Sequence, residues 1–246
     1  MKKATALFCL ILTLFPFFSC AILEIEAYDR IPNNGKYIAL TFDDGPHPIY
    51  TDQILSVLDE YGIKATFFQI GENLAYYGAA AIRVAEAGHE IGNHTYTHCN
   101  VNKIKDSSLA EEILLCERAI RDTTGVIPRV FRPPEGMRGE KLDAILEGCG
   151  YTPIYWSVDT YDWKGKDART IAEGVLKSVR AGDIILMHDF VGRRCQAVGA
   201  LRIMIPELLK AGYRFVTVSE LMKIGGVTTF NPKPQPLRSG AFADRS

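Results

Sequence analysis

Short apolar runs alternate with helix-length amphipathic segments along most of this chain of 246 residues. The apolar runs predict seven strands, at Tyr37–Phe42, Ala65–Ile70, His89–Gly92, Val130–Arg132, Thr152–Ser157, Asp183–Met187 and Arg214–Val218. The segments between them predict six helices, at Thr51–Tyr61, Gly78–Ala87, Ser107–Thr123, Glu140–Gly148, Ala168–Arg180 and Gln196–Ala211. Strands joined by helices pair in parallel, so the alternation predicts an α/β fold. We expect a single-domain distorted or trimmed (β/α) barrel with about seven parallel strands, with an open doubly wound sheet as the alternative.

The composition is that of an ordinary globular domain, with 47% hydrophobic and 23% charged residues. The formal net charge is −1 and no basic stripe is present, so nucleic acid is not an expected partner. We place the folded domain at residues 36–223, after an N-terminal linker at 22–35. Residues 224–246 contain three prolines within Pro232–Pro236 and few apolar residues, which predicts a flexible tail.

The first residues have the pattern of an export signal. Lys2 and Lys3 precede an apolar stretch, Ala4–Phe18, which is followed by small residues up to Ala21. This pattern predicts a signal peptide over residues 1–21 and an extracellular or cell-envelope location. Two alternatives remain: a lipid anchor at Cys20, or an uncleaved signal that holds the protein at the membrane. We otherwise expect no membrane contact, and a monomer.

Four cysteines lie beyond this segment, at Cys99, Cys116, Cys149 and Cys195. They are widely spaced and form no CxxC pair, which argues against a zinc–thiolate site. In an exported protein they could pair as disulfides, but a domain of this size does not need them to fold. Free thiols and disulfides both remain open.

Two adjacent carboxylates, Asp43 and Asp44, end the first predicted strand in the sequence TFDDG. A turn at the end of a strand can bring both side chains into one cleft, where they need a cation or an arginine to neutralise them. A solvent-facing turn is the simpler interpretation of such a motif taken alone. The third strand is followed by a second candidate, the sequence HTYTH. Its His94 and His98 are spaced i and i+4, which suits one cation.

Further polar side chains also follow predicted strands. Arg132 ends the fourth strand in RPPEG, Asp162 follows the fifth in DTYDW, and His188 ends the sixth in LMHD. Each alone could be a surface or packing residue. Because all of them lie at the carboxyl ends of parallel strands, where (β/α) barrels carry their active sites, we expect one shared site.

The motifs TFDDG, HTYTH, RPPEG, DTYDW and LMH, in this order, resemble the five signature motifs of the polysaccharide deacetylases, carbohydrate esterase family four. The resemblance runs from about residue 36 to 223, which makes this segment the expected catalytic domain. It implies a distorted (β/α) barrel and a hydrolase that removes acetyl groups from cell-wall or chitin-type polysaccharides. It also implies one divalent metal, usually zinc with cobalt as the alternative, held by Asp44, His94 and His98.

The resemblance assigns the remaining roles as well. Asp43 is expected to be the general base, paired with Arg132, and His188 the general acid, held by Asp162. The backbone N–H of Glu135 is the expected oxyanion donor. Trp163 and Leu186 are expected to wall the pocket for the acetyl group.

Glu135 departs from the family pattern, in which many relatives have tyrosine. A carboxylate beside the oxyanion would repel the lactyl carboxylate of an unsubstituted muramic acid, so we expect the N-acetylglucosamine units of peptidoglycan as the substrate. The alternative is that Glu135 pairs with Arg138 and faces away. An O-acetyl (xylan-type) esterase and a non-catalytic envelope glycan-binding protein are the competing functions.

Overall fold

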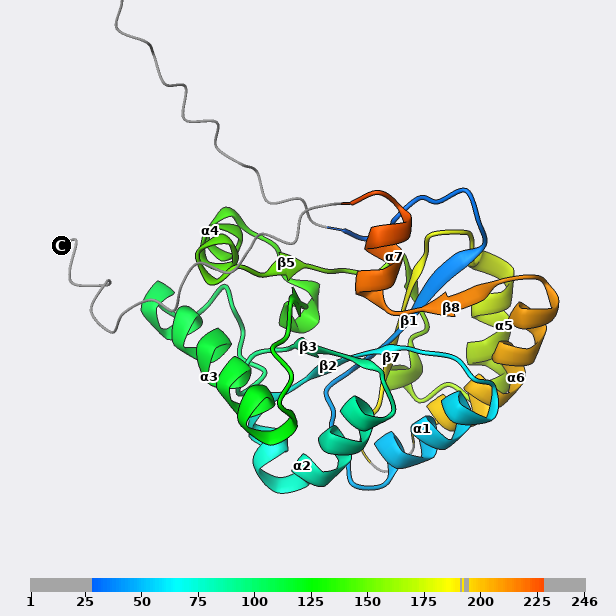
Figure 1. The fold of residues 1–246 in the computed structure, drawn as a ribbon, viewed down its shortest axis with the longest axis horizontal. Helices are drawn as coiled ribbons and strands as arrows, with labels where there is room; N and C mark the ends of the chain where they lie inside the picture. The colour runs from blue at the N-terminus through cyan, green and yellow to red at the C-terminus, as the bar shows by residue number, and fades with distance from the viewer. Residues whose placement is uncertain (1–27, 191, 193–194, 228–246) are drawn as a thin grey trace, which may run out of the picture.

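Eight parallel strands and seven α-helices form the fold of the computed structural model, which describes residues 28–190, 192 and 195–227 (Figure 1). The strands are β1 (Tyr37–Asp43), β2 (Thr66–Gln69), β3 (Glu90–Asn93), β4 (Val130–Phe131), β5 (Thr152–Pro153), β6 (Val158–Asp159), β7 (Ile184–His188) and β8 (Arg214–Val216). The α-helices are α1 (Tyr50–Glu60), α2 (Gly71–Glu86), α3 (Asp106–Thr124), α4 (Glu140–Cys149), α5 (Ala168–Ser178), α6 (Ala197–Lys210) and α7 (Val218–Ile224). Two short 3₁₀ helices, Pro134–Gly136 and Asp162–Lys164, complete the list.

The strands form one sheet that curls into a distorted barrel, as the alternation predicts. Seven strands run in the order β5-β4-β3-β2-β1-β7-β6, and β8 pairs with the first half of β1. The two outer strands, β5 and β6, are consecutive in the chain, so the residues between them cross the remaining gap. On one side of the gap Ile154 N–H donates to Phe131 O (2.8 Å), and on the other Ser157 N–H donates to Ile184 O (3.0 Å).

The alternation of side chains along β1 separates the core into two layers. Ile38, Leu40 and Phe42 point outward and pack against α1 and α6. Ala39 points inward, where it belongs to a cluster with Phe68, Val130, Ile154 and Ile184. Thr41 and Asp43 lie on the same side of β1 as Ala39. The barrel interior is therefore apolar at the start of β1 and becomes polar toward its carboxyl end.

Strand β7 has the same alternation, and its register with β1 fixes which side chains meet. Ile185 and Met187 belong to the outer layer, whereas Ile184 belongs to the interior. The register pairs Thr41 with Leu186 and Asp43 with His188. Two titratable side chains from distant parts of the chain are thus neighbours at the carboxyl end of the barrel.

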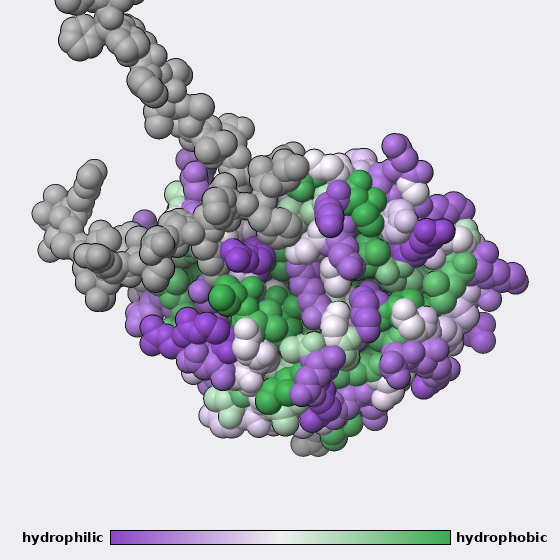
Figure 2. All heavy atoms as spheres, in the orientation of Figure 1, coloured by the Kyte–Doolittle hydropathy of each residue, from purple (hydrophilic) through white to green (hydrophobic). Residues whose placement is uncertain are grey.

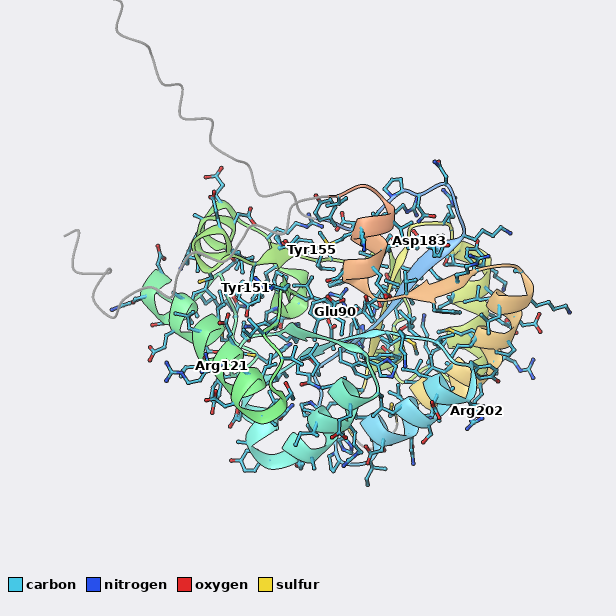
Figure 3. The ribbon with its side chains drawn as sticks, viewed as in Figure 1. Glu90, Arg121, Tyr151, Tyr155, Asp183 and Arg202 are labelled. Carbon is cyan, nitrogen blue, oxygen red and sulfur yellow. The ribbon has the colours of Figure 1, made fainter. Side chains whose placement is uncertain are left out.

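Helix α7, which the sequence did not predict, closes the opposite end. Thr217 and Glu220 form a capping box at its start. Its first N–H groups donate to side chains at the beginnings of β2 and β3: Val218 to Thr66 Oγ1 (2.9 Å) and Ser219 to Glu90 Oε2 (3.1 Å). Figure 3 shows Glu90 beside this helix, near the middle of the barrel.

The described part of the expected linker, residues 28–35, packs onto the barrel. Tyr28 and Ile31 are buried, at 6% and 1% exposure. Isolated β-bridges join Tyr28 to Ile154 and Arg30 to Asp183. The Nε atom of Arg30 also lies 2.5 Å from the buried carboxylate of Asp183. This segment thus covers the region where β5 and β6 leave the sheet.

Two details of the predicted elements are wrong. The strand expected at Thr152–Ser157 ends at Pro153, and the next strand, β6, begins only at Val158, because the carbonyls of Ile154 and Tyr155 accept hydrogen bonds from Arg132 between them. The helix predicted at Gly78–Ala87 begins earlier, at Gly71, as α2. The N–H groups of Gly71 and Glu72 start that helix by donating to the carbonyls of Thr95 and Tyr96, and its backbone kinks at Tyr77 just before the predicted start.

All four cysteines of the described domain are free thiols. No helix within the described ranges is long and apolar enough to cross a membrane. Hydrophilic and hydrophobic residues are interspersed over the face shown in Figure 2. The expected signal peptide, Cys20 and most of the C-terminal tail lie outside the described residues.

We expect Gly92→Ala to destabilise the barrel. Gly92 pairs with Phe68 across β2 and β3, and a Cβ atom there would lie 2.4 Å from the Phe68 ring. Overpacking of this kind lowers the free energy of unfolding by about 1–3 kcal/mol. The matched control is Gly174→Ala in α5, where a Cβ meets nothing within 4 Å and the helix gains up to about 1 kcal/mol. Urea denaturation checks both, and equal midpoints for the two variants would contradict the packing argument.

Candidate active site

A cavity of about 510 Å³ opens at the carboxyl end of the barrel. Its walls include residues from all five motifs: Asp43, Asp44, His94, His98, Glu135, Trp156, Asp159, Trp163, Leu186 and His188. Eight of the ten residues predicted for the site line it directly, and the other two, Arg132 and Asp162, contact lining residues from behind. The strand-end prediction therefore identified one site.

Asp44, His94 and His98 form a compact set of metal-ligand side chains. One ligand atom from each lies within 4.8 Å of the others. Asp44 Oδ1 is 3.5 Å from His94 Nε2 and 3.4 Å from His98 Nε2. Two imidazole nitrogens and one carboxylate oxygen are donors that suit a divalent cation and leave coordination positions open. The three residues therefore fit the divalent metal implied by the motifs.

Hydrogen bonding orients this set from outside. His94 Nδ1 lies 2.7 Å from the carbonyl oxygen of Arg132, which fixes the ring so that Nε2 faces Asp44. Asp44 and His98 have positive φ angles of 74° and 54°. Such angles are rare for residues other than glycine and cluster at functional sites.

Charge interactions within the set shift its pKa values. Burial alone would raise the pKa of Asp44, but the hydrogen bond and charge of His94, with His188 and His98, lower it. Burial, together with the charge of His94, lowers the pKa of His98. A low pKa keeps Asp44 ionised and His98 neutral near neutral pH, which are the states in which these two groups bind metals. Burial alone would lower the pKa of His94, but the charges of Asp43 and Asp44 raise it.

Arg132 holds Asp43 in place from inside the barrel. Its side chain has no exposed surface, and its Nη1 donates to Asp43 Oδ1 (2.8 Å) and to Thr41 Oγ1 (2.7 Å). Its Nε and Nη2 donate to the carbonyls of Ile154 and Tyr155. The second carboxylate oxygen of Asp43 remains 3.9 Å from His94 Nε2 and faces the cavity.

His188 is held by Asp162 in the same manner. Its Nδ1 lies 2.7 Å from Asp162 Oδ1, and its backbone N–H donates to Oδ2 (2.9 Å). Burial would lower the pKa of His188, but Asp162, with smaller contributions from Asp43 and Asp44, raises it to about 9. At neutral pH the imidazole therefore carries a proton next to Asp43.

Glu135 lies at the rim of the cavity, and the alternative pairing with Arg138 is wrong because Arg138 pairs with Asp29 instead. Glu135 has a positive φ of 58°. Of the two residues expected to wall the acetyl pocket, Leu186 is buried, at 3% exposure, and Trp163 is 53% exposed. Leu186 therefore lies deep in the cavity and Trp163 near its opening.

Sequence reasoning missed three residues of the site. Trp156 and Asp159 line the cavity and precede Asp162 at the same end of the sheet, so the strand-end rule could have found them. Asp189 directly follows His188, and its backbone N–H donates to the Asp43 carbonyl (3.1 Å). Its buried carboxylate accepts from Thr51 Oγ1 (2.6 Å), and burial is the main reason that its pKa rises to about 7.

The fold and this set of side chains define a hydrolase of the (β/α)-barrel class with a candidate site for one divalent cation. The sequence model of the polysaccharide deacetylase family matches residues 30–154, and the chain belongs to this family. It is 41% identical over 200 residues to a peptidoglycan-N-acetylglucosamine deacetylase of Bacillus cereus, an alignment covering 79% of this chain and 92% of that protein. The family expected from the five motifs is thus confirmed.

Solved structures of the same family have similar folds. The crystal structure of the Bc1960 peptidoglycan N-acetylglucosamine deacetylase superposes with a TM-score of 0.76 at 38% identity, covering 79% of this chain and 91% of that one. BA3943, a CE4 family pseudoenzyme from Bacillus anthracis, superposes with a TM-score of 0.77 at 29% identity, covering 82% and 70%. Fold similarity is thus the same for an enzyme and a pseudoenzyme.

We expect Asp162→Asn to lower the pKa of His188 from about 9 to its ordinary value of 6.5 or below. Burial lowers the pKa of the imidazole, and without the Asp162 charge fewer interactions counteract this effect. In the unmodified protein the raised pKa stabilises the fold below about pH 6.5, and this contribution is lost as the pH rises through about 9. NMR titration of the histidine rings measures the shift. Asp122→Asn, which removes an exposed ion pair with Arg121, is the control, and an unchanged His188 pKa in Asp162→Asn would refute the assignment.

Proposed function

We propose that this protein removes acetyl groups from N-acetylated sugars of a cell-wall polysaccharide, with the N-acetylglucosamine units of peptidoglycan as the principal substrate. One observation carries the proposal: a candidate base and a candidate acid, Asp43 and His188, are register neighbours beside the Asp44–His94–His98 set. Similarity to peptidoglycan-N-acetylglucosamine deacetylases at 36–41% identity supports the polymer and the sugar.

Asp44, His94 and His98 would hold the metal, and we propose zinc, with cobalt as the alternative. A divalent cation bound there supplies Lewis-acid chemistry, because it polarises an amide carbonyl and lowers the pKa of water. The Arg132 carbonyl sets the ring orientation of His94, and the φ angles of Asp44 and His98 aim the other two ligands inward.

Asp43 acts as the general base. Its free oxygen faces the cavity, whereas its other oxygen is occupied by Arg132, so a water molecule meets one defined proton acceptor. The Arg132 guanidinium is fixed by four acceptors and stacks at 4.2 Å from the Phe68 ring centroid, which leaves Asp43 little freedom to turn away.

Water attack on the acetyl carbon creates a negative oxygen and a nitrogen that must leave as an amine. The backbone N–H of Glu135, a residue at the cavity rim, donates to that oxygen. His188 donates its proton to the leaving nitrogen, because an amide nitrogen is a poor leaving group without one. Asp162 keeps His188 charged and oriented until this step.

The remaining walls select the acyl group and the sugar. Leu186 and Trp163 enclose the acetyl methyl, and Trp156, just before the DTYDW motif, adds a further aromatic surface to the cavity. Glu135 places a negative charge at the rim, which disfavours a free lactyl carboxylate and favours N-acetylglucosamine. We further propose that residues 1–21 direct export to the cell envelope, where such a substrate lies, with residues 36–223 as the catalytic domain.

The decisive experiment is acetate release by the purified full-length chain from peptidoglycan and from chitopentaose, with zinc added and after chelation. We expect release that disappears on chelation and returns with zinc, because the three ligands hold the required cation. Faster turnover of N-acetylmuramic acid substrates than of chitooligosaccharides would refute the sugar preference. No release with metal demonstrably bound would instead support the O-acetyl esterase or the non-catalytic glycan-binding function.

Two variants separate the base from the metal ligands. We expect Asp43→Asn to keep its metal but lose about 10²–10⁴-fold in kcat, because the general base is gone. We expect His94→Ala to lose both metal and turnover, because one of three ligands is removed. Metal content by elemental analysis, read beside acetate release, distinguishes the two. Near-normal turnover in Asp43→Asn would show that another group accepts the proton.

A further inference from the structure

Residues 94–98, here called the HTYTH loop, carry two of the three candidate metal ligands, His94 and His98. The side chain that holds this loop belongs to Glu112 of α3, a helix on the outside of the barrel (Figure 1). We propose that Glu112 is a positioning residue, which sets the affinity of the site for a divalent cation by fixing the HTYTH loop from outside the cavity. The proposal rests on the metal site of the function proposed above.

Both oxygens of the Glu112 carboxylate accept hydrogen bonds from the HTYTH loop. Oε2 accepts from the backbone N–H groups of Tyr96 (3.0 Å) and Thr97 (2.8 Å), and Oε1 accepts from Thr97 Oγ1 (3.0 Å). Hydrogen bonds to an ionised acceptor are stronger than those between neutral groups. Three donors on two consecutive residues therefore leave the loop little freedom to move relative to α3.

The loop needs a partner outside itself because two of its five residues have a strained backbone. Thr95 and His98 have positive φ angles of 67° and 54°, which residues other than glycine adopt at a cost. Such conformations persist only where the surrounding structure enforces them. Tyr96 and Thr97, the residues that Glu112 holds, lie directly between the two strained positions. Glu112 therefore helps to maintain the conformation that aims His98 into the cavity.

The two histidines of the loop differ in how far they depend on it. The His94 side chain is 2% exposed, and its own ring is fixed by the carbonyl of Arg132. The His98 side chain is 34% exposed and lies at the other end of the loop. The start of α2 anchors the loop through two of its carbonyls, whereas Glu112 binds the residues directly before His98. Glu112 thus acts mainly on His98, the outer of the two imidazole ligands.

Helix α3 gives the Glu112 carboxylate a fixed base. Leu109 and Ile113, on the same part of the helix, have no exposed surface and pack in the core. The Ile113 carbonyl accepts a hydrogen bond from Asn93 Nδ2 (2.9 Å), which ties this turn of α3 to the end of β3. The packing of α3 therefore determines where the carboxylate lies, and through the loop it determines where His98 lies.

The hydrogen bonds of Glu112 define which substitutions preserve its role. A glutamine oxygen can accept from both backbone N–H groups, and its NH₂ group can donate to the Thr97 hydroxyl, which also accepts. Alanine removes the acceptor altogether. Glu111 provides a matched control, because it precedes Glu112 in α3 and carries the same charge. Its side chain is exposed, and in the described part of the chain it forms no hydrogen bond with the loop.

Zinc binding, which requires no turnover, tests the proposal. In the full-length protein, calorimetry measures the dissociation constant for zinc in the unmodified chain, Glu112→Ala, Glu112→Gln and Glu111→Ala. We expect Glu112→Ala to bind zinc about 10–100-fold more weakly, because groups that orient a metal ligand affect metal affinity by about this factor. We expect Glu112→Gln to recover most of the lost affinity and Glu111→Ala to bind zinc like the unmodified chain.

A role of Glu112 in stability alone gives a different result. A lower urea midpoint in Glu112→Ala with an unchanged dissociation constant for zinc would overturn the proposal, as would equally weak binding in Glu111→Ala. If the unmodified chain binds no zinc, the metal site of the proposed function fails, and amide hydrogen exchange then decides on Glu112. Faster exchange at Tyr96 and Thr97 in Glu112→Ala than in Glu111→Ala would support its hold on the loop, and equal exchange would overturn it.

Discussion

The buried ion pair between Arg132 and Asp43 is the interaction on which the site depends. A guanidinium without any exposed surface is costly unless each of its nitrogen atoms is paired, and here two carbonyls, one hydroxyl and one carboxylate pair them. The two carbonyls become available because the chain leaves the sheet between β5 and β6. The break in the sheet is therefore the local structure that allows a charge to sit inside the barrel.

The alternation of side chains along the strands also determines which residues of the other motifs face the site. The parity that turns Ala39, Thr41 and Asp43 inward on β1 also turns Ile184, Leu186 and His188 inward on β7. A shift of β7 by one residue relative to β1 would turn the inward-facing side chains of β7, His188 among them, to the outer layer. The buried faces of Ile38, Leu40 and Phe42 against α1 and α6 therefore fix the chemistry as well as the core.

The sequence predicted the class of fold and the location of the site because both follow from local patterns. Strand-helix alternation indicates parallel strands, and polar residues after strands meet at one edge. It could not predict the break at Ile154 and Tyr155, since that depends on Arg132, 22 residues from Ile154 in the chain. The packing of residues 28–31 and the burial of Asp189 also depend on contacts between distant segments, with Asp183 and Thr51 respectively.

In this family the side chains at the site, and not the fold, decide whether a member is catalytically active. A pseudoenzyme and a deacetylase superpose on this chain with TM-scores of 0.77 and 0.76, so the backbone does not distinguish them. In this chain Asp43 is paired with Arg132, and His188 is paired with Asp162. The side chains of the three candidate metal ligands converge beside them. Positive φ angles at Asp44, His98 and Glu135 place backbone strain at the same site as these side chains.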